Sequence, residues 1–238
     1  MTVQELTLNI LAERLITVFD SKKLVSWAVE VMLLGYESEK LYVLAGLDFT
    51  STEEREKYFF ESLEELNIEV EKNEDKLIEQ YAITIAKKAV ENVIDLDYAF
   101  EKMRKVVSAS EYDQKYISFF KIDEDLDSLR YNNSVLFNSE LTLENAEEFI
   151  LEEFKIFLDM ENLKIPIEER KKSYCENCFK LNIPITKSKY QFKKPFKYMV
   201  WSCGICGSTK LKFDSNHEVK RLIIKEYKKH MLKMALPQ

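Results

Sequence analysis

Apolar residues recur every three or four positions through the first 160 residues of the chain. This spacing places them on one face of an α-helix. It predicts helices at residues 4–19, 21–34, 38–46, 51–66, 72–94, 95–107, 111–129 and 143–159. Because no useful length of strand-like alternation precedes residue 160, we expect an N-terminal α-helical array or bundle and a mainly α fold.

The pattern of apolar positions changes after residue 173. Residues 181–186 and 197–201 have the composition of strands, and residues 209–213 alternate. The run Ser215-Asn216-His217-Glu218 predicts a capping box, and helical spacing follows it through about Met234. We therefore expect a small C-terminal β-sheet followed by a helix.

Capping residues support several of the expected helix boundaries. Ser51, followed by Glu54, forms a capping box at one helix start. Ser38 can cap a short helix that ends near Gly46, and Gly35 suits the position just after a helix end.

Charge divides the chain into two parts. Residues 164–238 contain 18 Lys and Arg against 6 Asp and Glu, a net charge of +12. The first 163 residues contain 17 basic and 36 acidic residues, a net charge of −19. Such a shift marks a domain boundary. We expect an acidic helical domain at residues 1–160, a linker at 161–173, and a basic domain at 174–238.

Composition excludes several classes of protein. The chain is 46% hydrophobic, which is enough for a sizeable core and excludes a disordered tail. Gly and Pro number four each, too few for a collagen-like or loop-rich protein. No apolar run approaches the roughly 20 residues of a membrane-spanning helix. Residues 1–20 lack the pattern of a signal peptide. We expect a cytoplasmic protein without a membrane partner.

Four cysteines in two CxxC pairs are the strongest chemical signal. Cys175 and Cys178 are separated by 24 residues from Cys203 and Cys206. Four thiolates in this arrangement are the ligand set of a tetrahedral structural zinc site. The alternatives are two disulfides or unrelated thiols, and the lack of an export signal argues against disulfides. We therefore predict one Zn²⁺ bound by all four cysteines.

The surroundings of these cysteines resemble the zinc-ribbon family, in which metal holds a small antiparallel sheet. Gly204 and Gly207 accompany the second pair, as expected of a zinc knuckle, whereas the first pair lacks such glycines. The resemblance covers about 40 residues. A closed shell of four thiolates has no open coordination position, so we expect the zinc to stabilise the fold and not to activate water.

Lysines and aromatic residues interleave between the two CxxC pairs. The lysines are Lys187, Lys189, Lys193, Lys194 and Lys197, and the aromatic residues are Tyr190, Phe192, Phe196, Tyr198 and Trp201. Lysines attract phosphates and aromatic rings stack on unpaired bases, so the pattern suits nucleic-acid binding. Lys220, Arg221, Lys225 and Lys228 on the last helix would extend this surface. In the alternative interpretation, the aromatic residues form the ribbon core and the lysines its solvated face.

No motif predicts catalysis, and we expect no enzyme. The sequence has neither GxGxxG nor a P-loop, and neither His217 nor His230 belongs to a nucleophile motif. The carboxylate runs Asp123-Glu124-Asp125, Glu147-Glu148 and Glu152-Glu153 are expected to be solvated helix faces. We expect His217 to be solvated at its helix start, and His230 to border the apolar stripe of that helix.

Residues 10–155 resemble a group of small helical bacterial proteins. The resemblance rests on Ser26-Trp27-Ala28, Gly35-Tyr36-Glu37-Ser38, Leu44-Ala45-Gly46-Leu47, Tyr81-Ala82, Ile85-Ala86 and the segment 116–126. Some members are immunity proteins of polymorphic toxin systems, so the resemblance implies a helical fold and a toxin partner, without catalytic residues. An acidic surface fits a basic toxin, but it also keeps many proteins soluble.

Two hypotheses of function follow from these patterns. The first is a non-enzymatic immunity or antitoxin protein whose acidic helical domain binds a toxin. The second is a zinc-ribbon regulator that binds nucleic acid through its basic ribbon and last helix. A third interpretation is that the ribbon only supports the helical domain.

Overall fold

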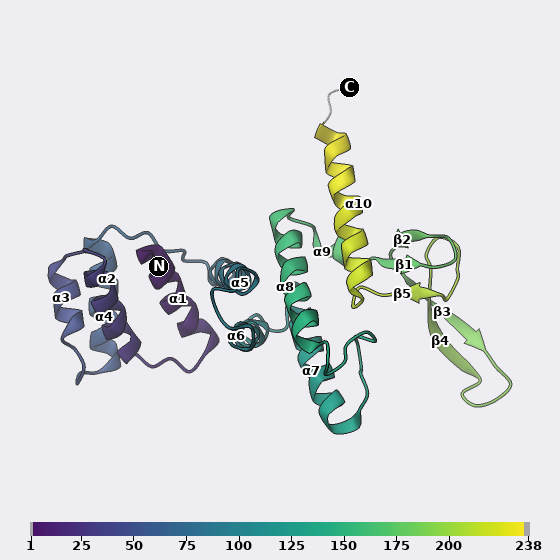
Figure 1. Cartoon of the computed structure of the whole chain (residues 1–238), viewed down its shortest axis with the longest axis horizontal. Helices are drawn as coiled ribbons and strands as arrows, with labels where there is room; N and C mark the ends of the chain where they lie inside the picture. The colour runs from purple at the N-terminus through teal and green to yellow at the C-terminus, as the bar shows by residue number, and fades with distance from the viewer. Residues whose placement is uncertain (1, 236–238) are drawn as a thin grey trace. The chain divides into compact units, whose positions relative to one another are not determined.

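The computed structural model describes residues 2–235 of the chain, with side chains through Lys233. Within this range it has ten helices and five short strands, so the fold is mainly α, as predicted (Figure 1). No helix of the described range is long and apolar enough to cross a bilayer. The chain forms two compact units. Unit 1 is Met1–Ile85 with Lys105–Tyr112, and unit 2 is Ala86–Arg104 with Asp113–Gln238.

Unit 1 is a helical bundle around one apolar core. Its helices are α1 (Val3–Ile16), α2 (Lys22–Leu33), α3 (Glu39–Ala45), α4 (Thr52–Glu65), the first part of α5 (Glu74–Val90) and the end of α6 (Leu96–Ala109). Trp27 lies at the centre, with its ring edge-on to Phe59 at a centroid distance of 4.8 Å. The indole N–H of Trp27 donates to Thr7 Oγ1 at 3.2 Å, so the one polar atom of this side chain is satisfied.

The predicted serine caps and the glycine after a helix end are confirmed in this unit, and of the capping box predicted at Ser51 the half in which Ser51 accepts the Glu54 N–H is present. Ser38 Oγ and Ser51 Oγ accept backbone N–H groups at the starts of α3 and α4. Gly35 follows α2 with a φ of +88°, a left-handed conformation that favours glycine.

Unit 2 is organised around α8 (Ala146–Asn162). Phe119 of α7 (Ile117–Asn132) packs on Phe154 of α8, with ring centroids 5.0 Å apart. Ile156 and Met160 of α8 share a second apolar cluster with Val219, Ile223 and Ile224 of α10 (His217–Ala235). One helix therefore packs against both α7 and the C-terminal helix.

Several observed helix starts differ from the prediction by one to six residues, and the reason is visible for α7 and α10. α7 begins at residue 117 rather than 111, because Glu111 and Tyr112 have φ values of 52° and 61°, outside the helical region. α10 begins at His217, and its cap is Asn216, whose Oδ1 accepts the Val219 N–H at 3.2 Å.

The strands form two small antiparallel sheets. β1 (Ser173–Cys175), β2 (Lys180–Asn182) and β5 (Leu211–Lys212) form one sheet in the order β2-β1-β5. β3 (Ile185–Tyr190) and β4 (Lys197–Ser202) form a separate hairpin (Figure 1). The predicted strand 181–186 is thus divided in two at Pro184, which lacks the N–H that a continuous ladder needs.

The segment 161–173, expected as a linker, contains the short helix α9 (Ile167–Arg170) and the start of β1. Glu161 is buried there and binds Arg170 at 2.7 Å and Lys115 at 3.2 Å. The compact units do not follow the charge boundary, because α8, α9, the strands and α10 all belong to unit 2. Independent folding of residues 174–238 stays a prediction.

Candidate metal centre and basic hairpin

The four cysteine sulfurs lie within 4.8 Å of one another. Cys175 Sγ is 3.6 Å from Cys206 Sγ, and Cys178 Sγ is 3.7 Å from Cys203 Sγ. Sulfurs bound about 2.3 Å from a tetrahedral zinc ion are about 3.8 Å apart, whereas a disulfide bond is about 2.05 Å long. The four residues are not disulfide-bonded, and their geometry could hold one metal ion.

The two CxxC turns have the same local geometry, although only the second contains glycines. The residue after each second cysteine is left-handed, with a φ of 57° at Phe179 and 76° at Gly207. The next backbone N–H, from Lys180 or Ser208, donates to the cysteine sulfur two positions earlier. Each turn therefore forms a knuckle, and in the first knuckle a phenylalanine adopts the conformation that glycine adopts in the second.

Backbone N–H groups favour thiolates at the second knuckle. The hydrogen bond from Ser208 N–H lowers the pKa of Cys206 to about 6. Burial opposes ionisation of Cys203, but the N–H groups of Cys206 and Ile205, at 3.5 and 3.4 Å, lower its pKa. At the first knuckle, burial raises the pKa of the Cys178 thiol to about 12. The charge of a bound cation would favour the thiolate form of Cys178 against this effect.

Asn182 joins the two knuckles, and its role was missed in the sequence. Its buried Nδ2 donates to Ser173 O at 3.3 Å and Lys180 O at 3.2 Å, while Oδ1 accepts the Gly204 N–H at 2.8 Å. One amide therefore links the first strand pair to the second knuckle. A single asparagine two residues before a proline has no sequence signal that distinguishes this role from that of an asparagine in an ordinary turn.

The β3–β4 hairpin exposes its aromatic side chains to solvent. Tyr190, Phe192 and Trp201 are 76%, 103% and 53% exposed. Phe196 and Tyr198 are exposed as well. The alternative interpretation, in which these aromatic residues form the ribbon core, is therefore wrong: the sequence pattern does not distinguish a buried aromatic strand from an exposed one.

The five lysines of the hairpin are all exposed, at residues 187, 189, 193, 194 and 197. Residues 177–213 contain eight lysines and no Asp or Glu. Lys197 Nζ lies 6.0 Å from the centre of the Tyr190 ring, a cation–π arrangement. The hairpin is thus strongly positive.

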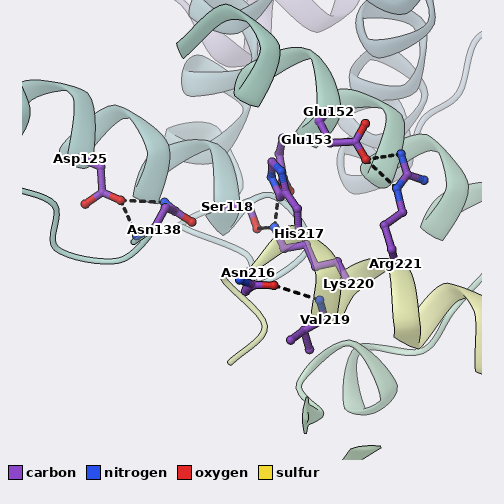
Figure 2. Close-up of polar contacts among 10 residues, drawn as sticks. All are labelled: Ser118, Asp125, Asn138, Glu152, Glu153, Asn216, His217, Val219, Lys220 and Arg221. Carbon is purple, nitrogen blue, oxygen red and sulfur yellow. Dashed lines mark hydrogen bonds and ion pairs between the residues drawn. The ribbon is translucent and has the colours of Figure 1, made fainter. Parts of the chain in front are cut away.

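The candidate residues on α10 divide into two groups. Lys220 is buried, with Nζ 2.6 Å from Glu153 Oε2 and 3.0 Å from Ser118 Oγ (Figure 2). Arg221 binds Glu152 at 2.6 Å and also pairs with Asp159. These two cations neutralise carboxylates of α8. Lys225 and Lys228 are exposed.

Three groups expected to be solvated are buried or nearly so. Glu153 is buried and His217 is 12% exposed, with its Nε2 3.0 Å from Glu153 Oε2 and its ring stacked on Phe149 at 3.9 Å. Asp125 is fully buried and accepts the backbone N–H groups of Phe137 and Asn138 at 2.9 and 2.7 Å. The expectation was wrong because the partners of each group come from other segments of the chain.

Comparisons with family models, curated proteins and solved structures find no significant match to the chain. The resemblance of residues 10–155 to immunity proteins therefore gains no support from them. The possible metal site rests on its own geometry.

Proposed function

We propose that the protein is a non-enzymatic zinc protein that binds nucleic acid through the β3–β4 hairpin. One observation carries the proposal: lysines and aromatic rings share an exposed hairpin that contains no carboxylate. Lysines contact phosphates and release counterions, and exposed rings provide surfaces on which bases stack. With no arginine in the hairpin, recognition rests on charge and stacking rather than on bidentate reading of base edges.

In this proposal, one structural Zn²⁺ holds the hairpin in place. Cys203 directly follows β4, and the Asn182–Gly204 hydrogen bond lies next to the start of β3. An isolated two-stranded hairpin is marginally stable in water, so this one depends on its attachment at the knuckles. Cys175, Cys178, Cys203 and Cys206 would supply all four ligands, which leaves the metal no position for a substrate.

Replacing the five hairpin lysines by glutamine should weaken binding and reduce its salt dependence. Affinity for a labelled single-stranded oligonucleotide is measured across a salt series. The slope of log K against log salt should lose about 0.7 in magnitude for each phosphate contact removed. The matched control replaces Lys22, Lys57, Lys72, Lys76 and Lys87, which are exposed lysines elsewhere, and has the same net charge. An equal effect of both variants would contradict a role for the hairpin.

A protein partner on unit 1 is the second candidate, favoured by two exposed apolar side chains. Val18 and Phe49 are fully exposed, each on a loop between helices. The Arg55 guanidinium joins these two loops, because it donates hydrogen bonds to Ser21 Oγ at 2.9 Å and to Leu47 O at 2.8 Å. Acidic residues are abundant in this part of the chain, so the partner would be basic, which fits the immunity-protein hypothesis. If no nucleic acid binds even at about 50 mM salt, where phosphate contacts are strong, this candidate replaces the first.

A further inference from the structure

The pairing of β3 with β4 assigns every hairpin residue to one of two faces. Thr186 lies opposite Trp201, Ser188 opposite Met199, and Tyr190 opposite Lys197. Residues directly opposite each other point to the same side of a sheet, and this side alternates along each strand. We call the side formed by these six residues the outer face. The inner face contains Ile185, Lys187, Lys189, Tyr198, Val200 and Ser202.

The inner face lies toward the second knuckle. A Cβ placed on Gly204 would lie 3.9 Å from Ile185 Cγ2, and one on Gly207 would lie 2.9 Å from Lys187 Nζ. Ser202 is buried and Val200 is partly buried. The outer face therefore points away from the knuckle.

The outer face presents its large side chains in a row. Trp201, Met199 and Lys197 alternate along β4 and are therefore about 7 Å apart, at about 3.3 Å per residue. Tyr190, opposite Lys197, extends the row across to β3. Met199 and Trp201 are 59% and 53% exposed, although large apolar groups are usually buried. The row offers several separate stacking surfaces.

We infer that the outer face binds unpaired nucleotides of a single strand, an inference that rests on the proposed function. Bases stack on Trp201 and Tyr190, while Lys197 and the tip lysines Lys193 and Lys194 contact the backbone phosphates. A β-ribbon can also enter the major groove of duplex DNA, where base edges are read mainly by Arg, Lys, Asn and Gln. Of these the outer face has only Lys197, and its other large side chains are Tyr190, Met199 and Trp201. In a duplex, the base faces that Trp201 and Tyr190 need are already stacked on neighbouring bases.

Fluorescence of the intact, zinc-loaded protein tests the inference. The chain has two tryptophans, and Trp27 is buried in the core of unit 1. The fluorescence that a ligand on the surface can quench therefore comes from Trp201. A mixed-pyrimidine single strand, as DNA and as RNA, should quench this emission and bind more tightly than a duplex of equal length. Trp201→Ala should weaken single-strand binding about tenfold. Trp201→Phe, which keeps a ring, should restore most of the affinity.

Tyr198→Ala is the matched control, because it removes an exposed ring from the same strand on the inner face. It should leave single-strand affinity nearly unchanged. Zinc content of each variant is measured to show that the ribbon is intact. If duplex and single strand bind equally well without quenching, the inference is overturned while the proposed function stands. If neither binds, both fail.

Discussion

Gly204, in the second knuckle, lies against the backbone of the segment between β2 and β3. A Cβ at this position would lie 2.8 Å from the backbone oxygen of Ile183, closer than real Cβ contacts. The same residue donates its N–H to Asn182, so the backbone cannot move away without loss of that hydrogen bond. A methyl group here would therefore disturb the turn that positions Cys203 and Cys206.

We expect Gly204→Ala to lower zinc affinity by about tenfold, since overpacking costs about 1–3 kcal/mol and metal binding is coupled to folding of the site. Competition with a chromophoric chelator measures the affinity. Gly46→Ala is the control, because its Cβ would meet only Val43 O, at an ordinary 3.5 Å. Unchanged affinity in Gly204→Ala would show that the close approach has no role in the metal site.

At the scale of elements, the charged contacts between α8 and α10 centre on Glu153. Burial disfavours its charged form, but the Lys220 ammonium and the His217 ring outweigh burial and hold the pKa of Glu153 at about 2. The neighbouring Glu152 pairs with Arg221 at a partly exposed position. Two adjacent carboxylates of one helix therefore differ in how much they stabilise the α8–α10 packing.

We expect Glu153→Gln to lower the free energy of unfolding by about 3 kcal/mol, because it leaves Lys220 buried without its counter-charge. Glu152→Gln is the matched control and should cost less than about 1 kcal/mol, as exposed ion pairs do. Urea denaturation at neutral pH measures both values. Equal costs for the two variants would contradict the assignment of Glu153 as the central contact.

The contact between Glu153 and Lys220 also makes the free energy of unfolding depend on pH in the acid range. Because the folded-state pKa of Glu153 is lower than its ordinary 4.5, its stabilisation is complete above about pH 4.5 and is lost as pH falls toward 2. Glu153→Gln should lack this part of the acid dependence. An identical loss of stability in both proteins between these pH values would show that Glu153 is not its source.

Elements with a strong local signal could be predicted from the sequence, and their long-range partners could not. The helices of unit 1, the four cysteines and the strands around residues 197–201 follow from apolar spacing, caps and the CxxC motif. Burial of Asp125 and Glu153 depends on groups 11 to 67 residues away in the chain. β1 was missed because three residues are too few to show alternation.

At the scale of the whole molecule, the net charge of +12 after residue 163 overstates the free positive surface. Arg170, Lys220 and Arg221 pair with Glu161, Glu153 and Asp159, carboxylates that precede residue 164 and are not counted in the +12. Among the described residues, no carboxylate partner is recorded for the hairpin lysines. The positive surface that remains therefore includes the five exposed lysines of the hairpin and the exposed lysines Lys225 and Lys228 of α10.

The most direct test of this account is the affinity of the intact protein for a single-stranded oligonucleotide before and after removal of the metal by a chelator. We expect tight binding by the zinc-loaded protein, loss of binding on chelation, and recovery when Zn²⁺ is returned. The helical signal in circular dichroism should largely persist, because the core of unit 1 contains no metal ligand. Unchanged affinity after complete loss of the metal, or no zinc in the purified protein, would contradict the account.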